Sequence, residues 1–243
     1  MTRRRFFAPP RAFNFSKRIV TLTADEAKHL REVLRLKPGD EVSVFDGEGK
    51  EFRARVAQAR RESAELDLDE EIAPASPESP LQIELAVALL KGEKFDLVVQ
   101  KATELGVTKI VPLITRYADI KLRDESDASK RVARWQRIAL EAAKQSGRAV
   151  VPTIENPTLF ESVLCPSSPC LLFSEKDGHG LTQTDTDVVT AIIGSEGGWS
   201  DEELEQARAA GAQIVTLGGR ILRAETAAIT AAALLQHRFG DLK

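Results

Sequence analysis

The chain has 243 residues, of which 42% are hydrophobic and 29% charged, and its formal net charge is −3 at pH 7. This composition is ordinary for a soluble globular protein. No apolar run approaches the roughly 18 residues that suggest a membrane-spanning helix, and prolines and an arginine interrupt the basic N-terminus before a signal-peptide core forms. We therefore expect a cytoplasmic protein with no membrane segment.

Charge is distributed unevenly along the chain. Residues 1–61 contain 15 Lys and Arg against 8 Asp and Glu, whereas residues 62–80 contain 7 acidic residues and no basic ones. The two segments offset each other in the net charge, but the electrostatic field that a ligand meets is local. A basic N-terminal face is therefore suited to binding phosphates.

The first part of the chain predicts a small β-barrel with one helix. The stretch 24–36 places apolar residues at helical spacing, namely Ala27, Leu30, Val33 and Leu34. Three later stretches alternate apolar and polar residues with period 2, as strands do: 41–47, 51–61 and 63–71. DGEGK joins the first two and is a hairpin signal. Barrels of this kind often bind RNA, although a fold alone does not establish a function.

A linker follows the acidic run. The sequence IAPASPESP holds three prolines and two serines and precedes a strongly apolar segment. Such a composition is typical of a connection between domains. We therefore expect a first domain at 1–72, a linker at 73–80 and a second domain at 81–243.

The second domain alternates between strand and helix patterns. The strand-like stretches are IELAVALL, KIVPLIT, PCLLFSE, VVTAIIGSE and AQIVTLGG, and the amphipathic helical stretches include 93–106 and 128–147. Buried strands that alternate with helices predict an α/β domain with a mostly parallel sheet. Ligands bind beyond the carboxyl ends of such strands. The loops after LLF, AII and IVT are therefore the candidate site.

The cysteines and histidines show no metal-ligand pattern. No second Cys or His pair stands at a metal-ligand spacing, so the sequence predicts no structural zinc and no other metal. Cys165 and Cys170 could form a disulfide, but two thiols in a reducing compartment are more often unpaired. The three histidines are scattered along the chain, which favours structural or surface roles.

The loop IIGSEGGWS combines glycines with a helix start. Ser200 and Glu203 form an S-x-x-E capping box, which predicts a helix that begins after Trp199. The glycines around Glu196 permit unusual dihedral angles or a close approach to a ligand. The loop lacks the glycine pattern of standard nucleotide-binding motifs. Taken alone, it is better explained by a tight turn than by a ligand site.

The next loop, LGGRILRAET, repeats this design and strengthens the case for a site. Arg220 and Arg223 precede a helix that Glu225 and Thr226 open, and residues 227–235 are almost all apolar or small. A helix that is apolar on every side is buried within a core or across a subunit interface. Burial of the helix in a core does not account for charged residues at its start. Their presence there favours Arg223 and Glu225 as functional residues.

Four motifs in this order resemble the RsmE family: KGEKFDLVVQKATELGV, EAAKQSGR, IGSEGGWSDEE and LGGRILRAETAA. The N-terminal RRRFF, HLREVLR and GDEVSVFDGEG are also similar to that family, so the resemblance covers almost the whole chain. It implies a homodimeric SPOUT-type methyltransferase that uses S-adenosylmethionine to methylate N3 of a uridine in 16S ribosomal RNA. The implied fold is a PUA-like N-terminal β-barrel and a C-terminal α/β domain with a trefoil knot.

This chain departs from the family pattern at three positions. Ser195 stands where proline is usual, Trp199 where the aromatic residue is often Phe, and Ala224 where Thr is usual. The serine is expected to loosen the loop while leaving Glu196 and both following glycines in place.

The resemblance implies that backbone groups of three loops bind the cofactor, with adenine among Leu217, Ile221 and Leu222. The expected cofactor-binding residues are Leu172, Phe173, Ser174, Ile193, Gly194, Ser195, Glu196, Gly197, Gly198, Leu217, Gly218, Ile221, Leu222, Arg223 and Thr226. Loss of the N3 proton from uridine spreads negative charge onto O2 and O4, and Arg223 is the expected cation beside those oxygens. Glu196 is a candidate base or orienting residue, and the alternative is that it holds backbone amides of the knot.

RNA is expected to bind the N-terminal cations and one face of the helix at 128–147. The residues assigned to RNA are Arg3, Arg4, Arg5, Arg11, Arg31, Arg35, Glu141, Gln145 and Arg148. Phe6 and Phe7 are candidates for base stacking or for the core. Two other functions remain open: a SPOUT-type methyltransferase for another nucleotide, and an inactive RNA-binding assembly factor.

Overall fold

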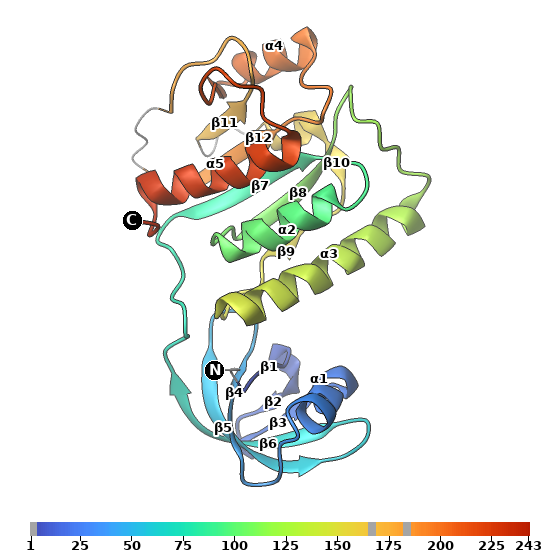
Figure 1. Cartoon of the computed structure of the whole chain (residues 1–243), viewed down its shortest axis with the longest axis vertical. Helices are drawn as coiled ribbons and strands as arrows, with labels where there is room; N and C mark the ends of the chain where they lie inside the picture. The colour runs from blue at the N-terminus through green and yellow to red at the C-terminus, as the bar shows by residue number, and fades with distance from the viewer. Residues whose placement is uncertain (1–3, 165–168, 182–185) are drawn as a thin grey trace. The chain divides into compact units, whose positions relative to one another are not determined.

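The computed structural model describes residues 4–164, 169–181 and 186–243, so Arg3 and Cys165 lie outside the described residues. The chain divides into two compact units (Figure 1). The N-terminal unit comprises Met1–Glu78 and Ala143–Val151, and the C-terminal unit comprises Ser79–Ala142 and Pro152–Lys243. The sequence-based boundaries did not foresee that Ala143–Val151 packs with the first unit. Hydrogen bonds from Arg5 to the carbonyl oxygens of Ala143 and Arg148 explain this assignment.

The N-terminal unit contains one mixed sheet. Its described elements are β1 (Arg5–Phe7), η1 (Pro10–Ala12), β2 (Phe13–Asn14), β3 (Ile19–Leu22), α1 (Ala24–Lys28), η2 (His29–Val33), β4 (Glu41–Phe45), β5 (Glu51–Ala59) and β6 (Ala64–Ile72). The six strands are ordered β1-β4-β5-β6-β3-β2 within the described residues. β1 pairs with β4 in parallel, and the other pairs are antiparallel.

Period-2 patterning gives this sheet one buried face. Val42 and Val44 of β4 are buried, as are Ala54 and Val56 of β5. The predicted helix begins as α1 and continues as one π turn, η2, in which the Leu34 amide donates to the His29 carbonyl oxygen at 3.0 Å. The wider turn changes the helical phase. This explains why Val33, which the helical pattern placed on the apolar face, is 65% exposed.

The C-terminal unit is built on a parallel sheet. Its described elements are β7 (Gln82–Ala88), α2 (Lys94–Glu104), β8 (Lys109–Ile114), α3 (Glu125–Ser146, whose last turn belongs to the N-terminal unit), β9 (Thr153–Ile154), β10 (Thr158–Leu159), η3 (Phe160–Val163), β11 (Cys170–Phe173), β12 (Val188–Ile193), α4 (Asp201–Ala209), β13 (Gln213–Val215) and α5 (Ala224–Phe239). Six of the described strands are ordered β10-β8-β7-β12-β11-β13, and β9 also pairs with β8.

Helical elements cover both faces of this sheet. On one face, Leu204 of α4 and Phe160 of η3 join a buried cluster with strand residues such as Leu172 and Ile192. On the other face, α5 packs on β7 and β12 and also contacts α2, as Figure 1 shows. Burying such aliphatic side chains contributes roughly 1.5–3 kcal/mol each at most.

The register of the sheet aligns three strand ends. Phe173 of β11 pairs with Ile193 of β12 on one side and with Val215 of β13 on the other. Because all three strands are parallel, their carboxyl ends lie side by side at one edge. The loops that follow them therefore meet, as expected for the ligand-binding edge of an α/β sheet.

Candidate active site

A cavity of about 410 Å³ lies at these three strand ends. Its lining comes from the loops after β11, β12 and β13 and from the start of α5: residues 173–175, 193–199, 215–218, 220–224 and Ala227. This volume falls within the roughly 300–1,000 Å³ range of small-molecule sites. The candidate site of the C-terminal unit is thus a hollow enclosed by loops that are far apart in the sequence.

The cavity brings together most of the residues assigned to the cofactor from the sequence. Leu172 and Thr226 are absent from its lining. Strand alternation places Leu172 in the core cluster, whereas Thr226 is exposed on the first turn of α5. The sequence reasoning missed lining residues at Glu175, Trp199, Val215, Thr216, Ala224 and Ala227. Glu175 had a signal, because it is a carboxylate two residues after a strand whose end was already selected.

The glycines of the β12 loop are required by contacts within the chain itself. A Cβ on Gly194 would lie 3.1 Å from the Trp199 ring, and one on Gly197 would lie 2.7 Å from Cβ of Tyr117. Gly198 has φ +70° and closes a turn by donating its amide to the Ser195 carbonyl oxygen at 3.0 Å. Packing within the chain therefore accounts for these glycines, which also line the cavity.

The predicted capping box at the start of α4 is confirmed. The Glu203 amide donates to Ser200 Oγ at 3.2 Å, and the Ser200 amide donates to Glu203 Oε2 at 2.9 Å. The other carboxylate oxygen of Glu203 accepts the Arg116 amide at 2.9 Å. The Ser200 and Glu203 amides therefore have partners within the chain and are not open to a ligand.

Glu196 lies beside a lysine that the sequence reasoning did not select. Lys94 Nζ, at the first residue of α2, donates to Glu196 Oε1 at 2.7 Å and lies 3.9 Å from Glu225 Oε2. Burial by itself would raise the pKa of Glu196. The hydrogen bond from Lys94 and bonds from backbone amides, together with the Lys94 charge, outweigh that effect and lower the pKa below its ordinary value. A general base near neutral pH needs the opposite shift.

Two arginines at the cavity mouth have no carboxylate partner among the described residues. Arg220 and Arg223 are exposed, and neither forms an ion pair with any residue that the structure describes. Arg223 is the N-cap of α5 and makes no side-chain capping bond. Glu225 is directed to Lys94 and not to Arg223. Arg223 is therefore a cation at the cavity rim that is available to a ligand.

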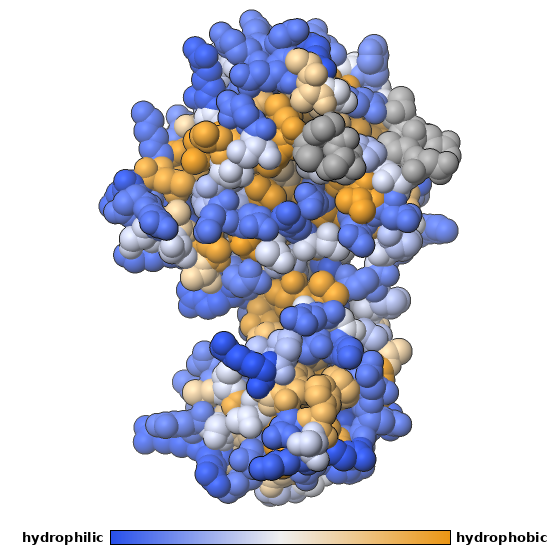
Figure 2. Space-filling model, turned by 180° about the vertical axis from the view of Figure 1, so that it is seen from behind, coloured by the Kyte–Doolittle hydropathy of each residue, from blue (hydrophilic) through white to orange (hydrophobic). Residues whose placement is uncertain are grey.

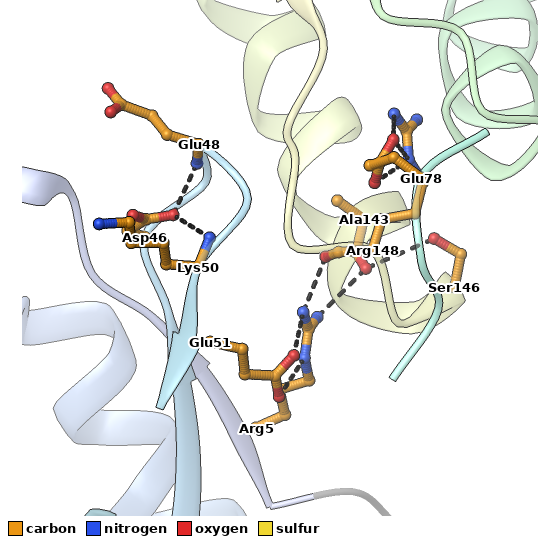
Figure 3. Close-up of polar contacts among 9 residues, drawn as sticks. All are labelled: Arg5, Asp46, Glu48, Lys50, Glu51, Glu78, Ala143, Ser146 and Arg148. Atoms are coloured by element: carbon orange, nitrogen blue, oxygen red, sulfur yellow. Dashed lines mark hydrogen bonds and ion pairs between the residues drawn. The ribbon is translucent and has the colours of Figure 1, made fainter. Parts of the chain in front are cut away.

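Arg5 and Arg148 are structural, so their assignment to RNA binding is wrong. Each is less than 5% exposed. Arg5 forms two 3.0 Å hydrogen bonds with Glu51 and donates to the carbonyl oxygens of Ala143 and Arg148, as Figure 3 shows. Arg148 forms an ion pair with Glu78 at 2.6 Å. Buried charges need such partners, and these guanidinium groups are not accessible to a phosphate.

The other described residues assigned to RNA are at least partly exposed. Arg4, Arg11, Arg35, Glu141 and Gln145 are exposed, and Arg31 is partly exposed. Gly147, with φ +86°, ends α3 before Arg148, so the predicted helix face shared by Glu141, Gln145 and Arg148 does not exist.

The two phenylalanines predicted as candidates for base stacking, Phe6 and Phe7, differ in burial. Phe6 is fully buried in the core of the N-terminal unit. Phe7 is partly buried and packs on Phe45 at 5.5 Å. The stacking role is therefore excluded for Phe6.

The described residues contain neither a metal-binding cluster nor a membrane-spanning helix. No group of three or more His, Cys, Asp or Glu within residues 4–164, 169–181 and 186–243 is arranged to hold a metal ion. Over the same ranges, every helix is too short or too polar to cross a membrane.

Family models assign the class of protein. The model of an RNA methyltransferase domain matches residues 77–236, and that of an RNA methyltransferase PUA domain matches residues 22–69. The fold, with its cavity at the ends of parallel strands, and these matches together define an RNA methyltransferase.

Relatives narrow this class to a family. The chain is 38% identical to ribosomal RNA small subunit methyltransferase E of Synechocystis sp., over 88% of this chain and 71% of the relative. It is 33% identical to the enzyme of that name from Rickettsia conorii, over 88% of each chain. The chain belongs to the ribosomal RNA small subunit methyltransferase E family, RsmE.

Solved structures share the whole fold. The crystal structure of this family's enzyme from Neisseria gonorrhoeae, bound to S-adenosyl methionine, has a TM-score of 0.89 and 36% identity, covering 99% of this chain and 100% of the other. A putative methyltransferase from Legionella pneumophila in complex with the same cofactor has a TM-score of 0.90 and 32% identity, with complete coverage of both chains.

Proposed function

We propose that this chain transfers a methyl group from S-adenosylmethionine to N3 of a uridine in 16S ribosomal RNA, and that the cavity at the ends of β11, β12 and β13 binds the cofactor. One observation supports the assignment of the cofactor to this cavity. The three strand-end loops enclose a cavity in a chain whose fold matches two cofactor-bound structures over 99% or more of its length.

The chemistry of the cavity fits the cofactor. S-adenosylmethionine carries positive charge at its sulfonium and ammonium groups, and the lining includes the carboxylates of Glu175 and Glu196. Glu175 forms no ion pair with the described residues, so its charge is available to a cationic ligand. Leu217 and Leu222 provide apolar surface for adenine. The bound cofactor supplies an electrophilic methyl group.

Arg223 is the proposed catalytic residue of this chain. Uridine N3 becomes nucleophilic when its proton passes to water, and negative charge then spreads onto O2 and O4. A guanidinium that is not committed to an ion pair can stabilise that charge. Arg223 has this property and stands at the cavity rim. Much of the remaining acceleration comes from holding N3 in line with the methyl group.

Glu196 is a proposed positioning residue in this scheme. Its lowered pKa keeps it ionised at neutral pH, where it holds Lys94 against the β12 loop. This arrangement supports the orienting role left open by the sequence and disfavours the role of general base.

We also propose a homodimer, a trefoil knot formed by the loops of the site, and action in the cytoplasm. The family resemblance supports all three. The dimer has one further support, because Leu97 of α2 and Leu234 of α5 are apolar residues that remain 40% and 37% exposed on neighbouring helices. Light scattering at micromolar concentration tests the dimer, and a monomer there contradicts it.

Nucleoside mass spectrometry of ribosomal RNA from a strain that lacks this gene tests the target. Loss of N3-methyluridine is expected. Loss of a different methylated nucleoside favours the alternative of another target. Calorimetry with S-adenosylmethionine tests the cofactor, and no binding at millimolar concentration favours the alternative of an inactive assembly factor.

A further inference from the structure

An exposed aromatic cluster lies on the N-terminal unit and has no part in the functions described above. The ring of Phe15 stacks on that of Phe13, with 5.7 Å between centroids and 19° between planes. Phe52 contacts both rings at 5.4 and 5.7 Å. Phe52 is buried and Phe13 partly buried, whereas Phe15 is 60% exposed. Figure 2 shows apolar surface among hydrophilic residues on this unit.

The turn that carries Phe15 is held in one conformation. Asn14 Oδ1 accepts the Lys17 amide at 3.1 Å and the Ser16 hydroxyl at 2.8 Å. Arg18, with φ +52°, donates its amide to the Phe15 carbonyl oxygen at 3.2 Å, and its guanidinium donates to backbone carbonyls of β6. An aromatic ring on an anchored turn loses little conformational entropy when a ligand stacks on it.

The segment that carries Phe13 and Phe15 is basic. Arg11 and Lys17 flank it in sequence, and both are exposed and without an ion pair to any described residue. No acidic residue occurs between Arg4 and Ala24. On the neighbouring strands, Glu71 pairs in register with Phe52 and is an exposed carboxylate. The basic segment therefore lies beside acidic residues of β6, and Arg11 and Lys17 are cations that form no ion pair with any described residue.

These features match an unpaired RNA base. A flat, exposed ring offers a stacking surface that accepts any base, and neighbouring cations contact the phosphates on either side. A protein partner would not need the cations, and a folded RNA duplex would not present a base to the ring. The cluster therefore suits a single-stranded segment.

We propose that Phe15, backed by Phe13, is a stacking platform for an unpaired base of the RNA substrate, with Arg11 and Lys17 binding the flanking phosphates. This inference rests on the proposed function, because it takes ribosomal RNA as the substrate. It adds a binding site beyond the cofactor cavity.

The test uses the full-length chain and a fluorescein-labelled oligouridylate, followed by fluorescence anisotropy, with a labelled RNA duplex of equal length as the comparison. Phe15→Ala is expected to weaken oligouridylate binding about 5- to 100-fold, the range that loss of one stacked base produces. Phe15→Tyr should retain binding, because it keeps the aromatic face. Duplex binding should change far less.

Two controls keep the result specific. Val33→Ala removes another exposed apolar side chain from the same unit and is expected to leave RNA affinity unchanged. All variants should bind S-adenosylmethionine with the affinity of the unmodified chain in calorimetry. Arg11→Ala and Lys17→Ala should each reduce the slope of log affinity against log salt by about 0.7, as expected for one phosphate contact on a single strand.

The outcomes separate this inference from the proposed function. If the unmodified chain binds RNA and methylates it, and Phe15→Ala does so equally well, the platform is refuted and the function stands. If the unmodified chain binds neither the cofactor nor RNA, the proposed function fails. If Phe15→Ala changes self-association in light scattering but not RNA affinity, the cluster is a contact between copies of this chain and the platform is refuted.

Discussion

The indole Nε1–H of Trp199 donates a 2.9 Å hydrogen bond to the backbone carbonyl oxygen of Phe173. This bond ties the loop after β12 to the end of β11, and the same indole packs 5.0 Å from the ring of Phe160. Trp199 thus connects two walls of the cavity, and this connection is called the brace below. A phenylalanine at this position provides the packing but not the hydrogen bond.

Trp199→Phe is therefore expected to destabilise the chain by about 0.5–1.5 kcal/mol, the net contribution of one hydrogen bond. The Phe173 carbonyl loses its partner, so the cavity wall loosens and affinity for S-adenosylmethionine falls a few-fold. Thermal unfolding and calorimetry measure the two effects. An unchanged affinity together with a lower melting temperature would show that the brace serves stability alone.

Arg223→Ala is expected to lower kcat about 100- to 1,000-fold, the usual effect of removing one group that stabilises developing negative charge. The fold should persist, because Arg223 forms no capping bond and no ion pair among the described residues. Cofactor affinity should remain within a few-fold of that of the unmodified chain. Arg220→Ala is the matched control, since Arg220 is an exposed cation of the same loop. Comparable losses in both variants would indicate a general electrostatic effect and remove the specific assignment.

Lys94→Met is expected to change the pH dependence of stability. The folded-state pKa of Glu196 is lowered, so its interaction with Lys94 stabilises the fold above the ordinary value of 4.5. That contribution is lost as pH falls through the lowered folded-state pKa. Both side chains are partly exposed, so the contribution is about 0.2–1 kcal/mol. Melting temperatures of the variant and the unmodified chain should differ near neutral pH and converge in strong acid. A gap that widens on acidification contradicts this sign.

Local patterns predicted much of the fold but little of its long-range pairing. The alternating residues of β4, β5 and β6 and the strand–helix alternation after residue 81 identified most elements. By contrast, β1, β2 and β3 have only two to four residues each, too few to show a period. The phase change that exposes Val33 depends on a π turn, which helical spacing does not reveal.

The candidate site was likewise predicted only in part from the sequence. The three strand-end loops were found because each follows an apolar strand and contains glycine or charge. The reason for Gly197 was not found, because Tyr117 lies 80 positions away in the sequence. The partners of Arg5 and Arg148 are Glu51 and Glu78, 46 and 70 positions away. A basic stretch therefore looks the same in the sequence whether its cations face solvent or a distant carboxylate.

Arg5 and its neighbour Arg4 differ in this respect, because Arg5 is buried and Arg4 is exposed. Arg5→Met is expected to destabilise the N-terminal unit by about 3–5 kcal/mol, because it leaves the Glu51 carboxylate buried without its partner. The variant also lacks the hydrogen bonds that Arg5 donates to the carbonyl oxygens of Ala143 and Arg148. Arg4→Ala, its exposed neighbour, should cost less than about 1 kcal/mol.

Hydrogen exchange of β4 and β5 amides measures this loss locally, and the Arg5→Met, Glu51→Leu double variant supplies the control. Replacing a buried ion pair by apolar side chains is often neutral, so the double variant should regain much of the stability that Arg5→Met loses. A stable Arg5→Met variant with weakened RNA binding would reverse the conclusion, because it would show that Arg5 contacts RNA and that the buried pair is dispensable.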